Sequence, residues 1–454
     1  MLKVINPATE EVVKEYETIS NAEVEKQIES AHQAYLDWRN TSFEYRAEKI
    51  QLLAKLLLTQ KEELAKLMTT EMGKLRKSAI SEVEKCAWVC NYYADHAANF
   101  LADELVETNA SKSFVSFQPM GIVLAIMPWN FPLWQVFRFA APALMAGNAA
   151  LLKHAPNVAG CAIAIQQLFK NAGLPEGLFI NLPIEVEQVK PLIGHPHVQA
   201  VTLTGSERAG SAVAALAGKN IKKTVLELGG SDAYLILEDA DLELAAEQCK
   251  LSRLLNTGQS CIGAKRIIVV DAVYDAFLEY FTEKMASAKI GDPMKDITTL
   301  APLARKDLRD NLHRQVEESL AKGANLHLGG QIPAQKGYYY PATILTAVKK
   351  GMPAFDEELF GPVAAVIRAK DEKEAIQLAN DSKFGLGAAI FTKDQAKGER
   401  IAKEQLEAGC CFVNAFVKSD PRLPFGGIKT SGYGRELSHY GIKEFVNVKT
   451  VWVD

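Results

Sequence analysis

The chain has 454 residues, of which 48% are hydrophobic and 23% charged, and its formal net charge is −4. This composition is typical of a soluble globular protein with two or three domains, and the slightly acidic balance gives no basis for binding nucleic acid or an anionic membrane. We find no signal-peptide pattern and no run of 18 apolar residues, so a cytoplasmic protein is expected. The seven cysteines form no CxxC pair, which predicts reduced thiols and no metal site.

The first quarter of the chain is predicted to be helical, because residues 21–100 are rich in Ala, Leu, Glu and Lys and contain few helix breakers. A short strand is expected at 114–117. Strand-like runs then precede helical ones, in the pairs 122–127 with 137–145, 149–152 with 159–171, and 198–203 with 210–216. This alternation predicts a parallel sheet with crossover helices, a doubly wound domain.

A domain boundary is predicted at residues 228–231, where glycines follow the last of these units. A second alternating series extends from Tyr234 to about Gly409, which predicts a second α/β domain. The carboxyl-terminal residues 444–453 alternate like a strand, and we expect this strand to pair outside its own domain.

The loop LSRLLNTGQSCIGAKR, residues 251–266, is the strongest candidate for a reactive site. Its cysteine, Cys261, lies among polar and glycine residues rather than in the apolar setting typical of a structural cysteine. Thiolates react and thiols largely do not, so polar surroundings suit a nucleophile. The loop alone leaves open whether Cys261 is a nucleophile or an unreactive loop cysteine.

Two further side chains are candidate partners of Cys261. Glu227 lies in TVLELGGSD, where a strand meets a glycine turn, and such a carboxylate suits a general base. Asn130 lies in the stiff segment IMPWNFP, and a fixed amide NH2 suits an oxyanion hole. Taken singly, Glu227 is as well explained by a salt bridge or helix cap, and Asn130 by a turn.

A nucleotide site is predicted from strand ends. Lys153 ends the predicted strand ALLK, and Gly205 and Ser206 follow the next strand in LTGSERAG, where a helix N-terminus can hold a diphosphate. The spacing is not GxGxxG, so the generic dinucleotide fingerprint is weak. Glu358 and Phe360, in EELFGPV, either clamp a ribose and a ring or form a plain turn.

Taken together, these segments resemble the aldehyde dehydrogenase superfamily. The matching motifs are PWNFP, LLK, LTGS, ELGG, NTGQSC, EELFGP and PFGGIKTSGYGRE, in that order and over nearly the whole chain. The resemblance implies an α/β fold with two doubly wound parallel-sheet domains and a β oligomerisation arm. The expected ranges are 1–110 and 119–228 for the dinucleotide-binding domain, 229–430 for the catalytic domain, and 111–118 with 431–454 for the oligomerisation element.

The resemblance also assigns roles to individual residues. Cys261 is then the nucleophile, Glu227 the base that activates water, and Asn130, with the Cys261 amide, the oxyanion hole. The residues expected to bind the cofactor are Pro128, Trp129, Lys153, Gly205, Ser206, Gly229, Glu358 and Phe360. The implied reaction is NAD(P)-dependent oxidation of an aldehyde to a carboxylate through a Cys261 thioester.

Within the family, GQSCIGAKR and FGGIKTSGYGREL look most like the branch that oxidises succinate semialdehyde. A substrate with a distal carboxylate needs a cation, and Arg138 is the candidate, two helical turns after Asn130 if both lie on one helix. An inter-domain salt bridge is the alternative role of Arg138. Ser419 and Lys418 are weaker candidate donors. Phe131 and Trp134 are expected to line the apolar wall of the substrate tunnel.

The expected cofactor is NAD or NADP, with no firm preference. Many NAD-preferring relatives carry Glu three residues after the lysine, whereas this chain has Pro156 there. The missing carboxylate removes repulsion against a 2′-phosphate, but proline donates nothing to it.

Alternatives to this reading are a broad-specificity or other semialdehyde dehydrogenase, a CoA-acylating enzyme and a non-enzymatic structural relative. Glu227 favours hydrolysis over transfer to CoA, and the presence of both Cys261 and Glu227 argues against the non-enzymatic alternative. The expected partners are a small aldehyde and further copies of the chain, in a homodimer or homotetramer whose arm strands need a covered edge.

Overall fold

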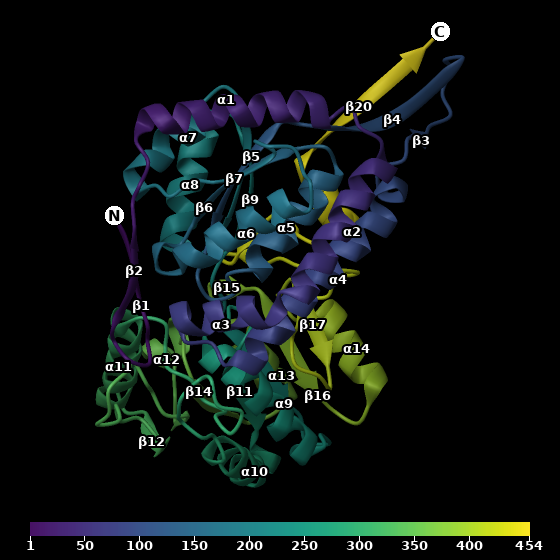
Figure 1. The fold of residues 1–454 in the computed structure, drawn as a ribbon. Coiled ribbons are helices and arrows are strands. Elements are labelled where there is room, and N and C mark those ends of the chain that lie inside the picture. The colour runs from purple at the N-terminus through teal and green to yellow at the C-terminus, as the bar shows by residue number, and fades with distance from the viewer.

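The computed structural model describes all of residues 1–454. Two large sheets, each with helices packed against it, form the upper and lower halves of the molecule, and a narrow β arm projects from the upper half (Figure 1). No helix combines the length and the apolar character needed to cross a membrane. The predicted fold class, two parallel-sheet units with an added β arm, is confirmed.

The helical first quarter consists of four helices. They are α1 (Asn21–Trp38), α2 (Phe43–Thr59), α3 (Lys61–Met72) and α4 (Arg76–Phe100). The side chains of Ser20 and Ser42 cap the start of α1 and α2, and each accepts a hydrogen bond from the backbone amide three residues later. Gly73 ends α3 with a left-handed φ of 79°. A hairpin of β1 (Leu2–Ile5) and β2 (Val12–Tyr16), which the sequence reading missed, precedes them.

The upper sheet has six strands in the order β19-β9-β8-β5-β6-β7. Its parallel strands are β5 (Ile122–Met127), β6 (Ala149–His154), β7 (Phe179–Asn181), β8 (Val198–Thr204) and β9 (Lys223–Glu227). The helices between them are α5 (Trp134–Met145), α6 (Ala159–Asn171), α7 (Val189–Gly194) and α8 (Glu207–Lys219). The short strand β19 (Gly432–Tyr433) returns from the end of the chain and pairs antiparallel with β9.

The lower sheet has seven strands in the order β12-β13-β14-β11-β10-β16-β17, all parallel except β12. The strands are β10 (Asp232–Ile236), β11 (Ala264–Val270), β12 (Asn325–Leu328), β13 (Thr343–Thr346), β14 (Val363–Ala369), β16 (Gly387–Phe391) and β17 (Cys410–Val413). Its helices are α9 (Leu242–Leu254), α10 (Tyr274–Ala286), α11 (Lys306–Ala321), α12 (Pro353–Asp356), α13 (Glu372–Asn380) and α14 (Gln395–Glu404). The chain passes from one sheet to the other between β9 and β10, through residues 228–231.

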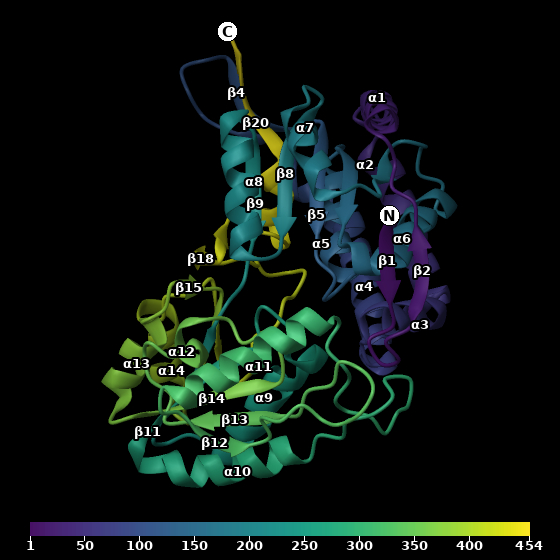
Figure 2. The same ribbon diagram turned by 90° about the vertical axis from the view of Figure 1, so that its left-hand side faces the viewer.

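The arm, whose strands β4 and β20 project from the molecule in Figure 2, is a three-stranded sheet in the order β20-β4-β3. It consists of β3 (Glu104–Leu105), β4 (Lys112–Pro119) and β20 (Val446–Val453). The carboxyl-terminal strand therefore pairs with a segment more than 300 residues earlier, as expected from its alternation. The remaining short elements are β15 (Phe384–Gly385), β18 (Ile428–Lys429) and α15 (Ser438–Ile442).

Candidate active site

The loop that carries Cys261 begins where α9 ends in an unusual turn. Asn256 and Thr257 both have left-handed backbones, with φ of 52° and 58°, and Gly258 follows with φ of 75°. Asparagine tolerates this conformation, and the Asn256 side chain also secures it by donating to the backbone oxygens of Asn130 (2.7 Å) and Gln259 (3.2 Å). The turn redirects the chain toward the interface between the two halves of the molecule.

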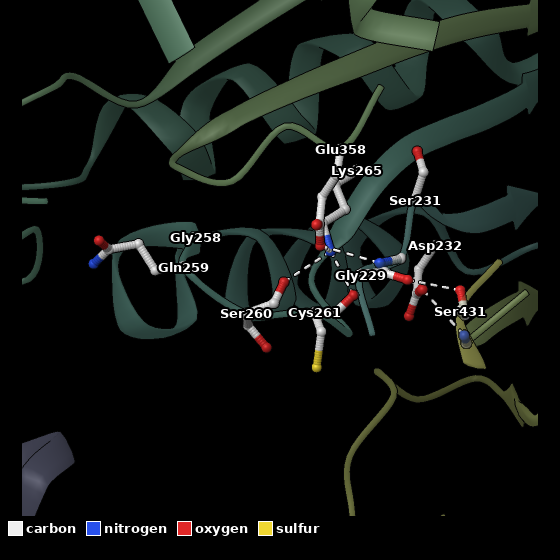
Figure 3. Close-up of polar contacts among 12 residues, drawn as sticks. Gly229, Ser231, Asp232, Gly258, Gln259, Ser260, Cys261, Lys265, Glu358 and Ser431 are labelled. Carbon is white, nitrogen blue, oxygen red and sulfur yellow. Dashed lines mark hydrogen bonds and ion pairs between the residues drawn. The ribbon is translucent and has the colours of Figure 1, made fainter. Parts of the chain in front are cut away.

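The buried Lys265 fixes the same loop through hydrogen bonds to its backbone. Lys265 Nζ donates to the backbone oxygens of Ser260 (2.8 Å) and Cys261, and it lies 3.3 Å from Glu358 Oε1. Figure 3 shows that the Cys261 sulfur points away from this group of contacts. The main chain of Cys261 is therefore fixed while its sulfur stays free to react.

The protonation state of Cys261 depends on two opposing effects. Cys261 is partly buried as a residue. Burial of its thiol raises the pKa to about 12, while the charges of Lys265 and Arg138 act to lower the pKa. With this pKa, the thiol form of Cys261 is dominant at neutral pH. Activation requires a base or added positive charge.

Asn130 lies just beyond the carboxyl end of β5 and contacts the Cys261 loop directly. Its Nδ2 donates to the Gln259 backbone oxygen at 3.1 Å, and its own backbone oxygen accepts from Asn256. One of the two Nδ2 hydrogens is thus used for positioning, and the other has no partner within the protein. Asn130 precedes α5, which begins at Trp134, so the predicted helical relation between Asn130 and Arg138 is wrong.

Glu227 is the last residue of β9 and is only 2% exposed. Neither carboxylate oxygen has a hydrogen-bond partner. Burial, together with the neighbouring charge of Glu436, raises the pKa of Glu227 well above its usual value, although Arg138 and Arg435 act in the opposite direction. An unpartnered carboxylate with a raised pKa has the properties of a general base.

Cys261 opens into a cavity of about 320 Å³ between the two halves of the molecule. Four of the expected substrate residues, Arg138, Phe131, Trp134 and Ser419, line the same cavity, as does Lys418. Neither Asn130 nor Glu227 is among the lining residues. The lining also includes three charged residues that were not predicted from the sequence: Lys74, in the turn between α3 and α4, and Glu82 and Lys85, on α4.

Arg138 lines the cavity but is also engaged in a buried ion pair. Its Nε pairs with Glu436, its Nη2 lies 3.4 Å from Thr204 Oγ1, and its guanidinium carbon lies 4.8 Å from the centre of the Phe425 ring. The structure thus contains both features considered from the sequence, a cavity-facing arginine and a salt bridge to a distant segment. Nothing local in the sequence pointed to Glu436.

The expected cofactor residues occupy the carboxyl ends of the upper strands. Lys153 is buried near the end of β6, and its Nζ contacts only the backbone oxygen of His154 at 3.2 Å; burial lowers the pKa of Lys153. Ser206 begins α8 by accepting from Ala209, and the Gly205 amide donates to the Glu227 backbone oxygen. A cation without a carboxylate and an adjacent helix N-terminus fit the phosphates of a dinucleotide.

The lower half contributes the expected cofactor residues Glu358 and Phe360. Glu358 Oε1 accepts from the Gly230 amide at 3.1 Å, and a Cβ added at Gly229 would overlap the Glu358 carboxylate. The rings of Phe360 and Trp129 pack edge to face, with centres 5.8 Å apart, and Trp129 follows Pro128 directly. A carboxylate against a glycine turn and an aromatic pair from distant segments are residue types that fit the ribose and ring of a nicotinamide cofactor.

Comparison with known proteins identifies the family. The family model described as "Aldehyde dehydrogenase family" matches residues 1–451, and the chain belongs to this family. The chain is similar to a probable succinate-semialdehyde dehydrogenase, NADP(+), of Synechocystis (49% identity, covering 99% of both chains) and to succinate semialdehyde dehydrogenase, NAD(P)+, Sad of Escherichia coli (48% identity, 99% and 97%). Among solved structures, succinic semialdehyde dehydrogenase from Streptococcus pyogenes in complex with NADP+ superimposes with a TM-score of 0.98, at 40% identity over both full lengths. The family predicted from the motifs is confirmed.

Proposed function

We propose that this aldehyde dehydrogenase oxidises succinate semialdehyde to succinate with NAD+ or NADP+. One observation carries the proposal: the Cys261 thiol opens into a cavity whose lining has four cations, Lys74, Lys85, Arg138 and Lys418, and one carboxylate, Glu82. A cavity of this charge favours an aldehyde with a second, anionic end over an uncharged one. The names of the Synechocystis and E. coli relatives support the same substrate.

In the proposed reaction, the Cys261 thiol gives its proton to a water molecule, and the sulfur forms a bond to the aldehyde carbon. The carbonyl oxygen becomes an oxyanion, which the free Nδ2 hydrogen of Asn130 and the Cys261 amide stabilise. A bound nicotinamide cofactor supplies the hydride acceptor for the two-electron oxidation. Cys261 then holds the acyl group as a thioester.

Glu227 resolves this thioester. Its unpartnered carboxylate takes a proton from a water molecule, the hydroxide adds to the acyl carbon, and the carbon–sulfur bond breaks to release the carboxylate product. The raised pKa of Glu227 makes it a stronger base than an exposed glutamate. Hydrolysis, rather than transfer to CoA, is the step that a buried base of this kind serves.

Dual cofactor use is part of the proposal. Lys153 has no carboxylate within salt-bridge distance, and Pro156 stands where an acidic residue would repel a 2′-phosphate. Lys153 attracts a 2′-phosphate when one is present, and nothing in this segment excludes the unphosphorylated ribose. Names that specify NADP(+) and NAD(P)+ among the relatives support use of both.

The proposed setting is a cytoplasmic homodimer or homotetramer that acts on a small aldehyde. The same-family alternative is a broad-specificity or other semialdehyde dehydrogenase, and the different-class alternative is a structural relative without activity. Initial rates with a substrate panel separate these possibilities.

The test compares succinate semialdehyde with butanal, which has the same chain length and no carboxylate, using NAD+ and NADP+ with and without CoA. We expect kcat/KM for succinate semialdehyde to exceed that for butanal by roughly 10- to 100-fold, because a charge-assisted contact is worth about 1.5–3 kcal/mol. Free succinate should form without CoA. Equal kcat/KM values for the two aldehydes would contradict the substrate assignment, and a bias of about a thousandfold toward one cofactor, equivalent to about 4 kcal/mol, would contradict dual use.

A further inference from the structure

Two cations of the cavity, Lys85 and Lys418, pair with no carboxylate, and Lys85 is the one that is partly buried, whereas Lys418 is exposed. Lys74 pairs with Glu82, and Arg138 pairs with Glu436. Lys85 lies on α4, and its Nζ donates to Ser419 Oγ at 2.8 Å and lies 4.3 Å from the centre of the Trp134 ring. No acidic oxygen lies within 4.0 Å of it, although it faces the cavity that contains Cys261.

We infer that Lys85, together with Ser419, binds the distal carboxylate of the substrate and sets the preference for carboxylated aldehydes. This inference rests on the proposed function and extends it to a residue on the helical first quarter of the chain. A largely desolvated ammonium without a counter-ion is costly, and an incoming carboxylate removes that cost. The Ser419 hydroxyl accepts from Lys85, so its own hydrogen remains available to donate to the same carboxylate.

The surroundings of Lys85 make this contact sensitive to pH. Burial and the nearby charge of Arg138, from α5, lower the pKa of Lys85 to about 8. Glu82 of the same helix and Asp420 of the Ser419 loop raise the pKa of Lys85, but Glu82 is paired with Lys74, and Asp420 is paired with Arg422 at 2.7 Å.

The remaining neighbours of Lys85 carry no negative charge. Burial raises the pKa of the adjacent Cys86, which therefore stays a neutral thiol. Lys74 and Lys418, which also line the cavity, are cations and cannot stabilise the charged form of Lys85. Lys85 is thus charged below about pH 8 and loses its charge above it.

The first experiment measures kcat/KM for succinate semialdehyde divided by kcat/KM for butanal. We expect this ratio to fall roughly 10- to 100-fold in Lys85→Met, through KM rather than kcat, because a hydrogen bond to a charged group is lost. Lys85→Arg should restore most of the ratio, because arginine keeps the charge. Lys77→Met removes an exposed lysine from the same helix, outside the cavity, and should leave the ratio at the wild-type value.

The second experiment uses the unmodified enzyme and so does not depend on the folding of a variant. Between pH 7 and pH 9.5 the KM for succinate semialdehyde, relative to that for butanal, should rise roughly tenfold as Lys85 loses its proton. In Lys85→Arg this rise should disappear. The common effects of pH on Cys261 and Glu227 cancel in the comparison of the two substrates.

These outcomes distinguish a failure of the proposed function from a failure of the role assigned to Lys85. If the wild-type enzyme does not prefer succinate semialdehyde, the proposed function fails. If the wild-type enzyme prefers it but Lys85→Met keeps the preference and the relative KM does not change with pH, the assignment of Lys85 is overturned and the preference depends on another cation of the cavity, Arg138 or Lys418.

Discussion

At the scale of single residues, the reactivity of Cys261 depends on charges that the fold brings under its loop. Burial raises the pKa of the thiol to about 12, and Lys265 is the largest influence in the opposite direction. The same lysine holds the backbone of the loop and lies 3.3 Å from the Glu358 carboxylate. Cys261 and Glu358 therefore share one buried cation.

This arrangement predicts how the free enzyme reacts with iodoacetamide. Because only the thiolate reacts, and its fraction increases until the pH reaches the pKa, alkylation of Cys261 should accelerate roughly tenfold per pH unit from pH 7 to pH 9 without a plateau. Peptide mass spectrometry would give the rate at Cys261, with the buried Cys249 as an internal control that reacts only after unfolding. A plateau below pH 8 would show that the resting thiol is already activated.

At the scale of elements, the turn after α9 has a strict geometric requirement at Gly258. Its φ of 75° favours glycine, and an added Cβ would overlap the backbone of Gly361, in the loop that carries Glu358 and Phe360. This close approach packs the segment that carries Cys261 against the loop that carries Glu358 and Phe360.

We expect Gly258→Ala to destabilise the protein by about 2 kcal/mol or more and to reduce kcat/KM, because both the backbone and the loop contact are strained. Gly218→Ala is the matched control: Gly218 lies in α8, and nothing comes within 4 Å of an added Cβ. That change should leave the melting temperature equal or slightly higher. Equal thermal unfolding and activity in the two variants would rule out the steric requirement at Gly258.

At the scale of the whole molecule, the β arm exposes apolar side chains on a sheet that nothing in one chain covers. Val448 is 61% exposed, Trp452 48% and Leu105 77%, and β20 is an edge strand. An exposed apolar edge strand favours association with another copy.

The double variant Val448→Asp with Trp452→Asp should therefore convert an oligomer into a smaller species, because charge would be buried in the contact. Light scattering coupled to size-exclusion chromatography measures the change in mass. Asn447→Asp places one charge on the neighbouring position of β20, whose side chain points to the other face, and should keep the wild-type mass. If the wild-type protein is itself a monomer, the arm has no role in assembly.

The sequence by itself determined the family, the alternation of strands and helices, and the roles expected of Cys261, Glu227 and Asn130. These features are encoded locally: strand periodicity, glycine turns and the nucleophile loop are each contiguous in the chain. The amino-terminal hairpin was missed because its second strand, VVKEY, is almost entirely exposed and has no regular alternation.

Only the tertiary structure decided which charges meet inside the cavity. Lys85 and Ser419 are 334 positions apart, and Arg138 meets Glu436 from another segment near the end of the chain. A lysine on an amphipathic helix has the same local pattern whether it faces solvent or a substrate. Its partner, its loss of solvent and its pKa arise only when α4, α5 and the loop before β18 pack together, so the specificity of the site is a property of the folded chain.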